Sequence, residues 1–225
     1  MSTRAGVWHR AAAWSLDAAA CALVVAAAFA SRWGSGLREL DQRTQATFVH
    51  AYEAMARHGL GDGLPDMAGL LDDSALRGAI LALQAGLLHA LIVPVLAFTV
   101  AMGVLQTLGA ASRRAASPGK RALGLRVVRP DGTRAGPVRV LLREAAGLLS
   151  WLSLNIGHAL AAGPRRLALH DRIAGLQVVQ DTPAPLPAWA RAWLLLQGAA
   201  MVLGTVWLAL HLLALAGEAA QRVFG

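Results

Sequence analysis

Three apolar runs divide this chain, and each is long enough to cross a lipid bilayer as a helix. They cover residues 11–30, 78–108 and 189–216. At 1.5 Å rise per residue, about 20 apolar residues span the ~30 Å hydrocarbon core. Pro94 lies inside the second run, where it predicts a kink, and Trp189 and Trp193 open the third as interfacial anchors. The pattern therefore predicts at least three transmembrane helices.

The first run also fits a second interpretation, a cleaved signal peptide. Arg4 and Arg10 supply a basic start, and Ala28-Phe29-Ala30 resembles a cleavage site. Asp17 in the middle of the run and the length of the run both favour a retained transmembrane helix.

Between the first two runs, residues 31–77 form a polar segment. Apolar side chains recur there every three to four residues from Leu37 to Met55, which predicts an amphipathic helix against the membrane surface or the helix bundle. Asp72, Asp73 and Ser74 predict the start of the next helix.

The segment 138–162 is harder to assign because only residues 145–154 are cleanly apolar, which is short for a crossing. Residues 109–137 carry seven basic residues against Asp131 alone, and residues 163–191 carry four arginines, so both segments are expected on the cytoplasmic side. The segment 31–77, with five arginines and seven acids, is expected outside. A single crossing by 138–162 would place the two flanking basic segments on opposite sides of the membrane. We therefore expect a re-entrant or interfacial helix, with a four-crossing bundle as the alternative.

Two similar pentads, GLRVV at 124–128 and GLQVV at 175–179, flank that segment. Both have the composition of short strands, and an Arg-Pro-Asp-Gly turn follows the first. If they pair, they lie on the same side of the membrane. The expected fold is therefore an all-α integral membrane protein: a small bundle of three or four transmembrane helices, a re-entrant or interfacial helix, and a short cytoplasmic β-like pairing.

Composition agrees with a membrane protein. The 225 residues are 56% hydrophobic and 15% charged, whereas a soluble domain carries about a quarter charged residues. The net charge of +8 comes from arginines beside apolar runs, without the basic-aromatic pattern of RNA-binding proteins. We therefore expect anionic lipid headgroups, not nucleic acid, as the partner of this charge. Cys21 has no second cysteine to form a disulfide with.

Asp17 is the most informative single residue, because a carboxylate within a membrane span needs a partner. Arg10 lies seven residues earlier on the same helical face, about 10 Å away along the axis. A third group, Asp171 or Arg172, could reach the space between them and form an arginine–carboxylate cluster. The alternative is that Asp17 only forms hydrogen bonds with a neighbouring helix.

Several motifs resemble the RDD family of membrane proteins. They are Arg10 before Asp17, SPGKRALGLRVVRPDG at 117–132, VLLREAAG at 140–147 and LHDRIAGLQVV at 169–179. The family is named for one Arg and two Asp, which correspond here to Arg10, Asp17 and Asp171. The resemblance implies an RDD domain over residues 5–180, with 31–77 as an outer insertion and 188–216 as an additional helix. It also implies transport, with sodium/proton exchange proposed for some members. Leu176 departs from the threonine usual in the family.

Two functions remain open. In the first, Arg10, Asp17, His170, Asp171 and Arg172 form a site that transports an ion or small solute, with Asp17 as the titrating group. In the second, the chain is a non-enzymatic scaffold or assembly factor that binds lipid, a partner membrane protein or further copies of itself. Asp171 would then be a plain helix cap.

Other site chemistries find little support. Ser117-Pro118-Gly119 lacks the glycine spacing of a phosphate-binding loop, so we expect a turn in which Lys120 and Arg121 hold lipid phosphates. His170 lacks further metal ligands at a workable spacing, and no nucleophile–base pair emerges. We expect neither an enzyme, a metal nor a cofactor. The expected location is the bacterial inner membrane, with the N-terminus in the cytoplasm.

Overall fold

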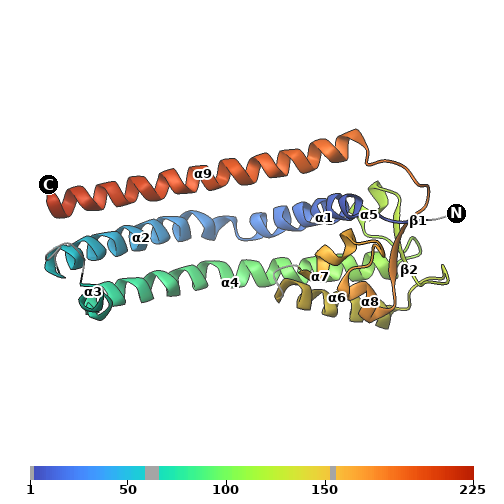
Figure 1. Ribbon diagram of the computed structural model, residues 1–225, viewed down its shortest axis with the longest axis horizontal. Helices are drawn as coiled ribbons and strands as arrows, with labels where there is room; N and C mark the ends of the chain where they lie inside the picture. The colour runs from blue at the N-terminus through green and yellow to red at the C-terminus, as the bar shows by residue number, and fades with distance from the viewer. Residues whose placement is uncertain (1–2, 59–65, 153–155) are drawn as a thin grey trace. The chain divides into compact units, whose positions relative to one another are not determined.

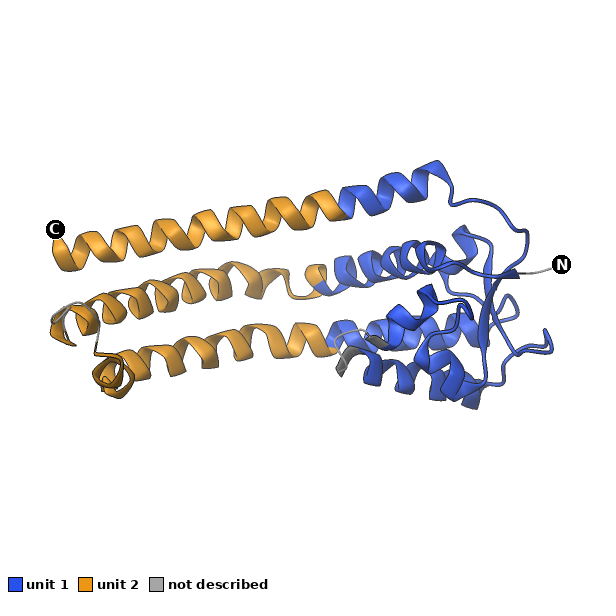
Figure 2. Cartoon of the chain, in the orientation of Figure 1, with its two compact units in different colours: residues 1–25, 97–197 blue, residues 26–96, 198–225 orange. Residues whose placement is uncertain are grey.

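A computed structural model describes residues 3–58, 66–152 and 156–225 of the chain (Figure 1). The described residues fall into two compact units, coloured separately in Figure 2. Unit 1 contains residues 1–25 and 97–197, and unit 2 contains residues 26–96 and 198–225.

Within the described residues, three helices are long and apolar enough to cross a membrane. They are α1 (Val7–Ala28), α4 (Ser74–Ala111) and α9 (Ala188–Phe224). Helices α4 and α9 contain the second and third apolar runs, and α1 covers residues 11–28 of the first, so the three predicted spans are confirmed as helices. Asp73 accepts hydrogen bonds from the backbone N–H groups of Ala75 and Leu76, which explains why α4 begins at Ser74.

Unit 2 contains α2 (Ala30–His58), the short α3 (Met67–Asp72), residues 74–96 of α4 and residues 198–224 of α9. The predicted amphipathic helix is therefore present, and it is longer than its apolar pattern. Its Arg43 donates to the carbonyl of Ala82 in α4 at 2.6 Å, and its Asp41 contacts His211 of α9 at 2.9 Å. These contacts place α2 against the bundle, as one of the two alternatives expected.

A three-stranded antiparallel sheet with the order β1–β3–β2 lies in unit 1 (Figure 1). Its strands are β1 (Thr3–Arg4), β2 (Leu125–Val128) and β3 (Gln177–Gln180). Strands β2 and β3 pair along their whole length, with Leu125 opposite Gln180 and Val128 opposite Gln177. The predicted pairing of the two pentads is confirmed, whereas β1 was not predicted. Because β2 and β3 pair, the chain between them must return to the side of the membrane from which it started.

The segment between the strands contains α6 (Pro137–Leu152), α7 (Ile156–Ala159), the 3₁₀ turn η1 (Leu160–Ala162) and α8 (Leu169–Ala174). Residues 153–155, inside the segment that was hard to assign, lie outside the described residues. Helix α6 is about 24 Å long at 1.5 Å per residue, short of the hydrocarbon core. Its Val140, Arg143 and Ser150 are buried, whereas Leu141 and Leu148 are exposed. An apolar exposed face on a short helix fits the expected re-entrant or interfacial helix and does not fit a single crossing.

The core of unit 1 joins the sheet to the helices around it. Leu125, Val127, Leu176 and Val178 of the sheet region and Val140 of α6 are at most 2% exposed. Small alanines of α1 and Ala190 of α9 complete the same cluster. This core fixes α8 and the short α5 (Pro118–Ala122) beside the first turns of α1.

Candidate functional site

Asp171 is the centre of a buried ion-pair cluster in unit 1. The side chain lies in the first turn of α8 and is 0% exposed. One carboxylate oxygen accepts from Nη1 of Arg10 at 2.6 Å, and the other accepts from Nε of Arg143 at 2.9 Å. The backbone N–H of Ala168 also donates to this carboxylate, at 3.3 Å. Asp171 therefore caps its own helix and joins it to α1 and α6.

Electrostatics keep this carboxylate ionised. Burial alone raises the pKa of Asp171, but the adjacent guanidinium groups of Arg143 and Arg10 outweigh burial, and the pKa lies well below its ordinary value. Arg143 is balanced in turn by Glu144, whose carboxylate accepts from Nη1 at 2.6 Å. Arg10 also donates to the carbonyl of Arg166 at 2.7 Å. The cluster thus combines charge pairing with fixed directions for both guanidinium groups.

His170 belongs to the same cluster, and its protonation follows from one contact. Nη2 of Arg143 lies 3.1 Å from Nε2 of His170. A guanidinium can only donate, so Nε2 accepts and the ring proton is on Nδ1. Burial and the charge of Arg143 lower the pKa of His170 to about 3, so the ring is neutral. His158 lies beside it, with ring centroids 5.0 Å apart. Within the described part of the chain, no His, Cys, Asp and Glu side chains group in a way that could hold a metal ion.

Asp17 forms a second polar centre with different chemistry. It is 1% exposed, and its carboxylate accepts from Gln106 of α4 at 2.8 Å, from the Ser117 hydroxyl at 2.6 Å and from the backbone N–H of Gly119 at 2.7 Å. Three neutral donors therefore replace the water that a carboxylate loses on burial. The Gly119 N–H lies in the first turn of α5, so Asp17 caps that helix from α1.

Gly119 makes this arrangement possible. A Cβ atom at that position would collide with the backbone carbonyl oxygen of Ala13 in α1. Only glycine lets α5 approach α1 closely enough for its N–H to reach Asp17. The SPGK stretch therefore begins the short helix α5, which packs against α1. It does not form the turn that the sequence suggested.

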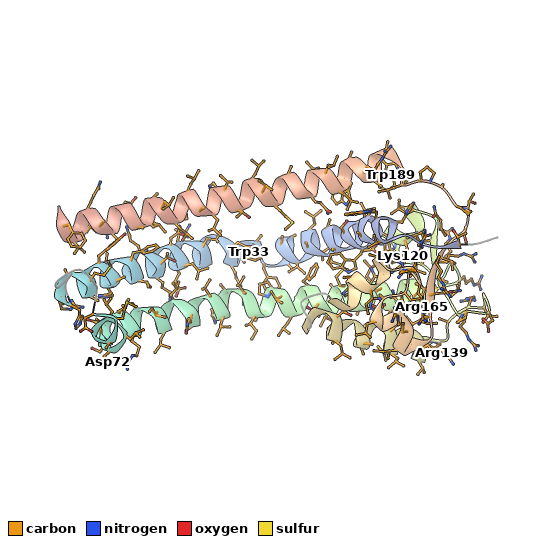
Figure 3. The ribbon with its side chains drawn as sticks, viewed as in Figure 1. Trp33, Asp72, Lys120, Arg139, Arg165 and Trp189 are labelled. Carbon is orange, nitrogen blue, oxygen red and sulfur yellow. The ribbon has the colours of Figure 1, made fainter. Side chains whose placement is uncertain are left out.

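Lys120 corrects another expectation. It is 8% exposed, and its ammonium donates to the Gln106 side-chain oxygen and to Ser117 Oγ, the latter at 3.3 Å. Figure 3 labels Lys120 together with Arg139 and Arg165, which, unlike Lys120, are exposed. Lys120 is therefore not the surface lysine that the sequence suggested, because its ammonium is buried among protein acceptors, and its contact with a lipid phosphate stays a prediction. Arg121 is exposed and donates to the Ala116 carbonyl at 2.9 Å, so its lipid role stays a prediction.

The structure brings some of the expected site residues together and separates others. Arg10, His170 and Asp171 meet in one cluster, as expected. Arg172 is exposed, outside that cluster. Asp17 is bound by neutral donors, so the expected arginine shared between Asp17 and Asp171 is not what the structure contains. The second arginine on Asp171 is Arg143.

A cavity of about 460 Å³ in unit 1 connects the two polar centres. Its charged and polar lining residues are Arg10, Thr99, Gln106, Lys120, Arg143, Glu144, His158 and His170. The rest of its wall is mainly apolar and includes Trp14, Phe98, Met102 and Leu148. A mostly apolar cavity with a few convergent polar groups is the usual form of a small-molecule site.

These features agree with a comparison against protein families. The model of the RDD family, a family of membrane proteins, matches residues 4–175. The chain belongs to the RDD family. Arg10, Asp17 and Asp171, the RDD residues expected from the sequence, all lie inside the matched region, and α9 follows it. No curated protein and no solved structure matches the chain.

Sequence reasoning missed four residues of the site: Gln106, Ser117, Arg143 and Glu144. Arg143 and Glu144 did give a signal, because they are charged residues within the apolar stretch VLLREAAG. Gln106 gave a weaker signal, as a polar residue near the end of the second apolar run. Ser117 gave none beyond its place in the SPGK motif.

Proposed function

We propose that this RDD protein transports an ion or small solute, which it binds in the cavity of unit 1. One observation carries the proposal: charged and polar side chains from α1, α4, α5, α6 and α8 meet at the wall of one cavity that is otherwise apolar. Two of these helices, α1 and α4, are candidate membrane spans. Polar groups so placed are costly in a membrane protein unless they serve binding or packing.

The residues divide into two roles. Asp17 and Asp171 are fully buried and accept hydrogen bonds from protein donors, so we assign them to holding α5, α6 and α8 in place. Lys120, Arg143 and His170 line the cavity, and we assign the solute contacts to them. This revises the expectation that Asp17 itself carries the transported ion or proton.

Filling the cavity tests this proposal. A Cβ added at Gly103 or Gly147, two glycines that line the cavity, meets no atom within 4 Å, so Gly103→Leu and Gly147→Leu place bulk in open space. Gly204→Leu is the matched control, since this glycine of α9 is not among the lining residues of the cavity and its added Cβ also meets nothing within 4 Å. Uptake of radiolabelled sodium, phosphate and succinate is measured in proteoliposomes.

We expect uptake of at least one probe by the wild type and the control, and a loss of that uptake in both filled variants. Uptake equal to that of protein-free vesicles for all three probes, or uptake that survives both leucines unchanged, contradicts transport through this cavity.

A scaffold or assembly role is the second candidate, and one observation favours it. The charges of the two polar centres balance when taken together. The cations are Arg10, Lys120 and Arg143, and the carboxylates are Asp17, Glu144 and Asp171. Such a network can serve packing alone. In that case the exposed Arg113 and Arg114 would recruit anionic lipid, a partner membrane protein or another copy of the chain. Co-purification of a stoichiometric partner that R113E/R114E abolishes, together with no uptake of any probe, would favour this role.

We further propose that the sheet and its arginine-rich loops face the cytoplasm of a bacterial inner membrane. The support is the excess of arginine in residues 109–137 and 163–191. Thiol labelling in intact cells tests it on a Cys21→Ala background. Arg134→Cys and Arg165→Cys, both exposed, should label only after permeabilisation, and Asp72→Cys should label before it. The reverse pattern overturns this orientation.

A further inference from the structure

We propose that the cavity takes an amphipathic anion: a carboxylate or phosphate group carried on an apolar chain. This inference rests on the proposed function, because it names the class of solute that the same cavity binds. Three observations support it: cationic side chains predominate at the cavity wall, hydrogen-bond donors are available there, and the rest of the lining is apolar.

Cationic side chains outnumber carboxylates at the cavity wall. Arg10, Lys120 and Arg143 line it, whereas Asp17 and Asp171 are buried and absent from the lining. Among the described carboxylates, Glu144 alone lines the cavity, and it already accepts from Arg143 at 2.6 Å. The two ion pairs of Asp171, with Arg10 and with Arg143, therefore have their positive partner at the cavity wall, and an anion there is nearer to these cations than to the buried carboxylate.

The donors point to the same chemistry. An ammonium has three N–H donors, and in the described structure Lys120 uses two of them, on Gln106 and Ser117. One of these contacts engages the Gln106 side-chain oxygen, a potential cation ligand of the wall. Three cationic side chains line the wall and Glu144 is the one described carboxylate there, so an oxyanion meets a surplus of charged donors, whereas a sodium ion meets a net positive charge.

The apolar lining adds a requirement for the rest of the solute. Trp14, Phe98, Met102 and Leu148 belong to the wall, and the cavity volume of about 460 Å³ is far larger than an inorganic anion needs. A bare phosphate would leave this apolar surface in contact with water. An alkyl chain attached to the anion would cover it and gain the hydrophobic contribution.

The experiment compares probes that share an alkyl chain of similar length and carry an anionic, neutral or cationic headgroup. Decanoate, decyl phosphate, decanol and decyltrimethylammonium are titrated onto the full chain in phosphatidylcholine nanodiscs, and binding to empty nanodiscs is subtracted. We expect saturable binding of the two anions, about tenfold tighter than that of decanol or decyltrimethylammonium. Equal or tighter binding of the neutral or cationic probe overturns the inference.

Two variants locate the binding. Lys120→Met should weaken anion binding about tenfold, and Lys120→Arg should largely retain it. If Lys120→Met does not fold, Gly103→Leu gives the same answer, because it fills the cavity without touching a charge. Arg126→Gln, which removes an exposed charge of β2, and Gly204→Leu are the matched controls and should bind as the wild type does. Anion binding that survives both Lys120→Met and Gly103→Leu overturns the inference.

A further arm distinguishes a free anion from a lipid headgroup. Nanodiscs that contain phosphatidylglycerol offer the same phosphate chemistry on a phospholipid. Competition with decanoate in these discs identifies the lipid as the occupant, and unchanged decanoate binding identifies a free solute. The anion proposal and the transport proposal can fail separately. If Gly103→Leu blocks sodium uptake and no anion binds, transport through the cavity is supported and the anion proposal is wrong.

Binding of the anion should depend on pH through Lys120. Burial, followed by the charge of Arg143, lowers the pKa of this ammonium to about 8. The groups that act on it are Arg143 and Glu144 of α6, Asp17 of α1 and Asp171 of α8. Below pH 8 the ammonium is charged and attracts the anion, so affinity should fall as the pH rises through 8. The fall should move to higher pH in Lys120→Arg, and an affinity that is flat between pH 7 and pH 10 contradicts this role.

Discussion

Replacing Asp171 by asparagine gives the sharpest test of the buried cluster, because it removes one charge and almost no volume. Asp171 is 0% exposed and accepts from Arg10 at 2.6 Å and from Arg143 at 2.9 Å. The amide keeps one acceptor oxygen, but its NH₂ group must face one of the two guanidinium groups. The variant therefore leaves a donor opposite a donor and a surplus positive charge in a buried site.

The cost follows from the burial. Removing one partner of a buried ion pair typically costs about 3–5 kcal/mol, because the remaining charge stays buried without compensation. For a chain of this size, that corresponds to a fall in Tm of roughly 6–20 °C. Because the pKa of Asp171 lies well below its ordinary value, its stabilisation is present above the unfolded pKa of about 3.9 and is lost only in stronger acid. The difference between wild type and variant should thus be constant from pH 5 to pH 8.

The assay is thermal unfolding of the purified protein in a neutral detergent. Asp181→Asn is the control, since its carboxylate is 46% exposed and pairs with Arg126 on the surface, where such a pair contributes about 0–1 kcal/mol. Adding Arg10→Gln to Asp171→Asn should recover part of the loss, because it removes the surplus charge. An Asp171→Asn protein as stable as the control, or a double variant with additive losses, would refute the reasoning.

Three further substitutions test the packing around the site, each by the same thermal assay. Gly119→Ala should cost about 1–3 kcal/mol, because its methyl group must push α5 away from α1. Ser117→Ala should cost about 1–3 kcal/mol by removing a donor to the buried Asp17, whereas Ser35→Ala on an exposed surface should change stability by less than about 0.5 kcal/mol. Leu176→Thr should cost about 2–4 kcal/mol, because it removes apolar volume and buries a hydroxyl in the core; no loss would show that this position is looser than its burial indicates.

The sequence predicted the elements of this fold well, because they depend on local patterns. Long apolar runs predict α1, α4 and α9, and their ends follow local signals such as Asp73 ahead of α4. The β2–β3 pairing was also predicted, from two pentads of similar composition. Strand β1 was missed because two residues, Thr3 and Arg4, carry no periodicity, and their pairing with β3 is set by the tertiary fold.

The candidate site was only partly predictable, for a related reason. The one-helix geometry that placed Arg10 on the face of Asp17 was sound, but it could not identify partners 89 to 161 residues away. Asp17 accepts hydrogen bonds from neutral donors of α4 and α5, because Gly119 lets the backbone of α5 approach that of α1. A hydropathy pattern does not reveal such a close approach of two backbones. Lys120 resembled a surface lysine in sequence for the same reason, since its burial depends on the same contact.

The strand order β1–β3–β2 has a consequence for the biosynthesis of this chain. The first strand pairs with residues 179–180, so it has no partner strand until the ribosome has made the whole family region, which ends at residue 175. During that time the first helix is already in the membrane, and its Arg10 lacks the acid that neutralises it, because Asp171 is made 161 residues later. The unpaired guanidinium must then stay in the hydrated interface. The sheet therefore closes late, and only then can Arg10 become buried beside Asp171. A nascent chain that stops before α8 would keep Arg10 unpaired in its first helix, and quality-control proteases would be expected to degrade it.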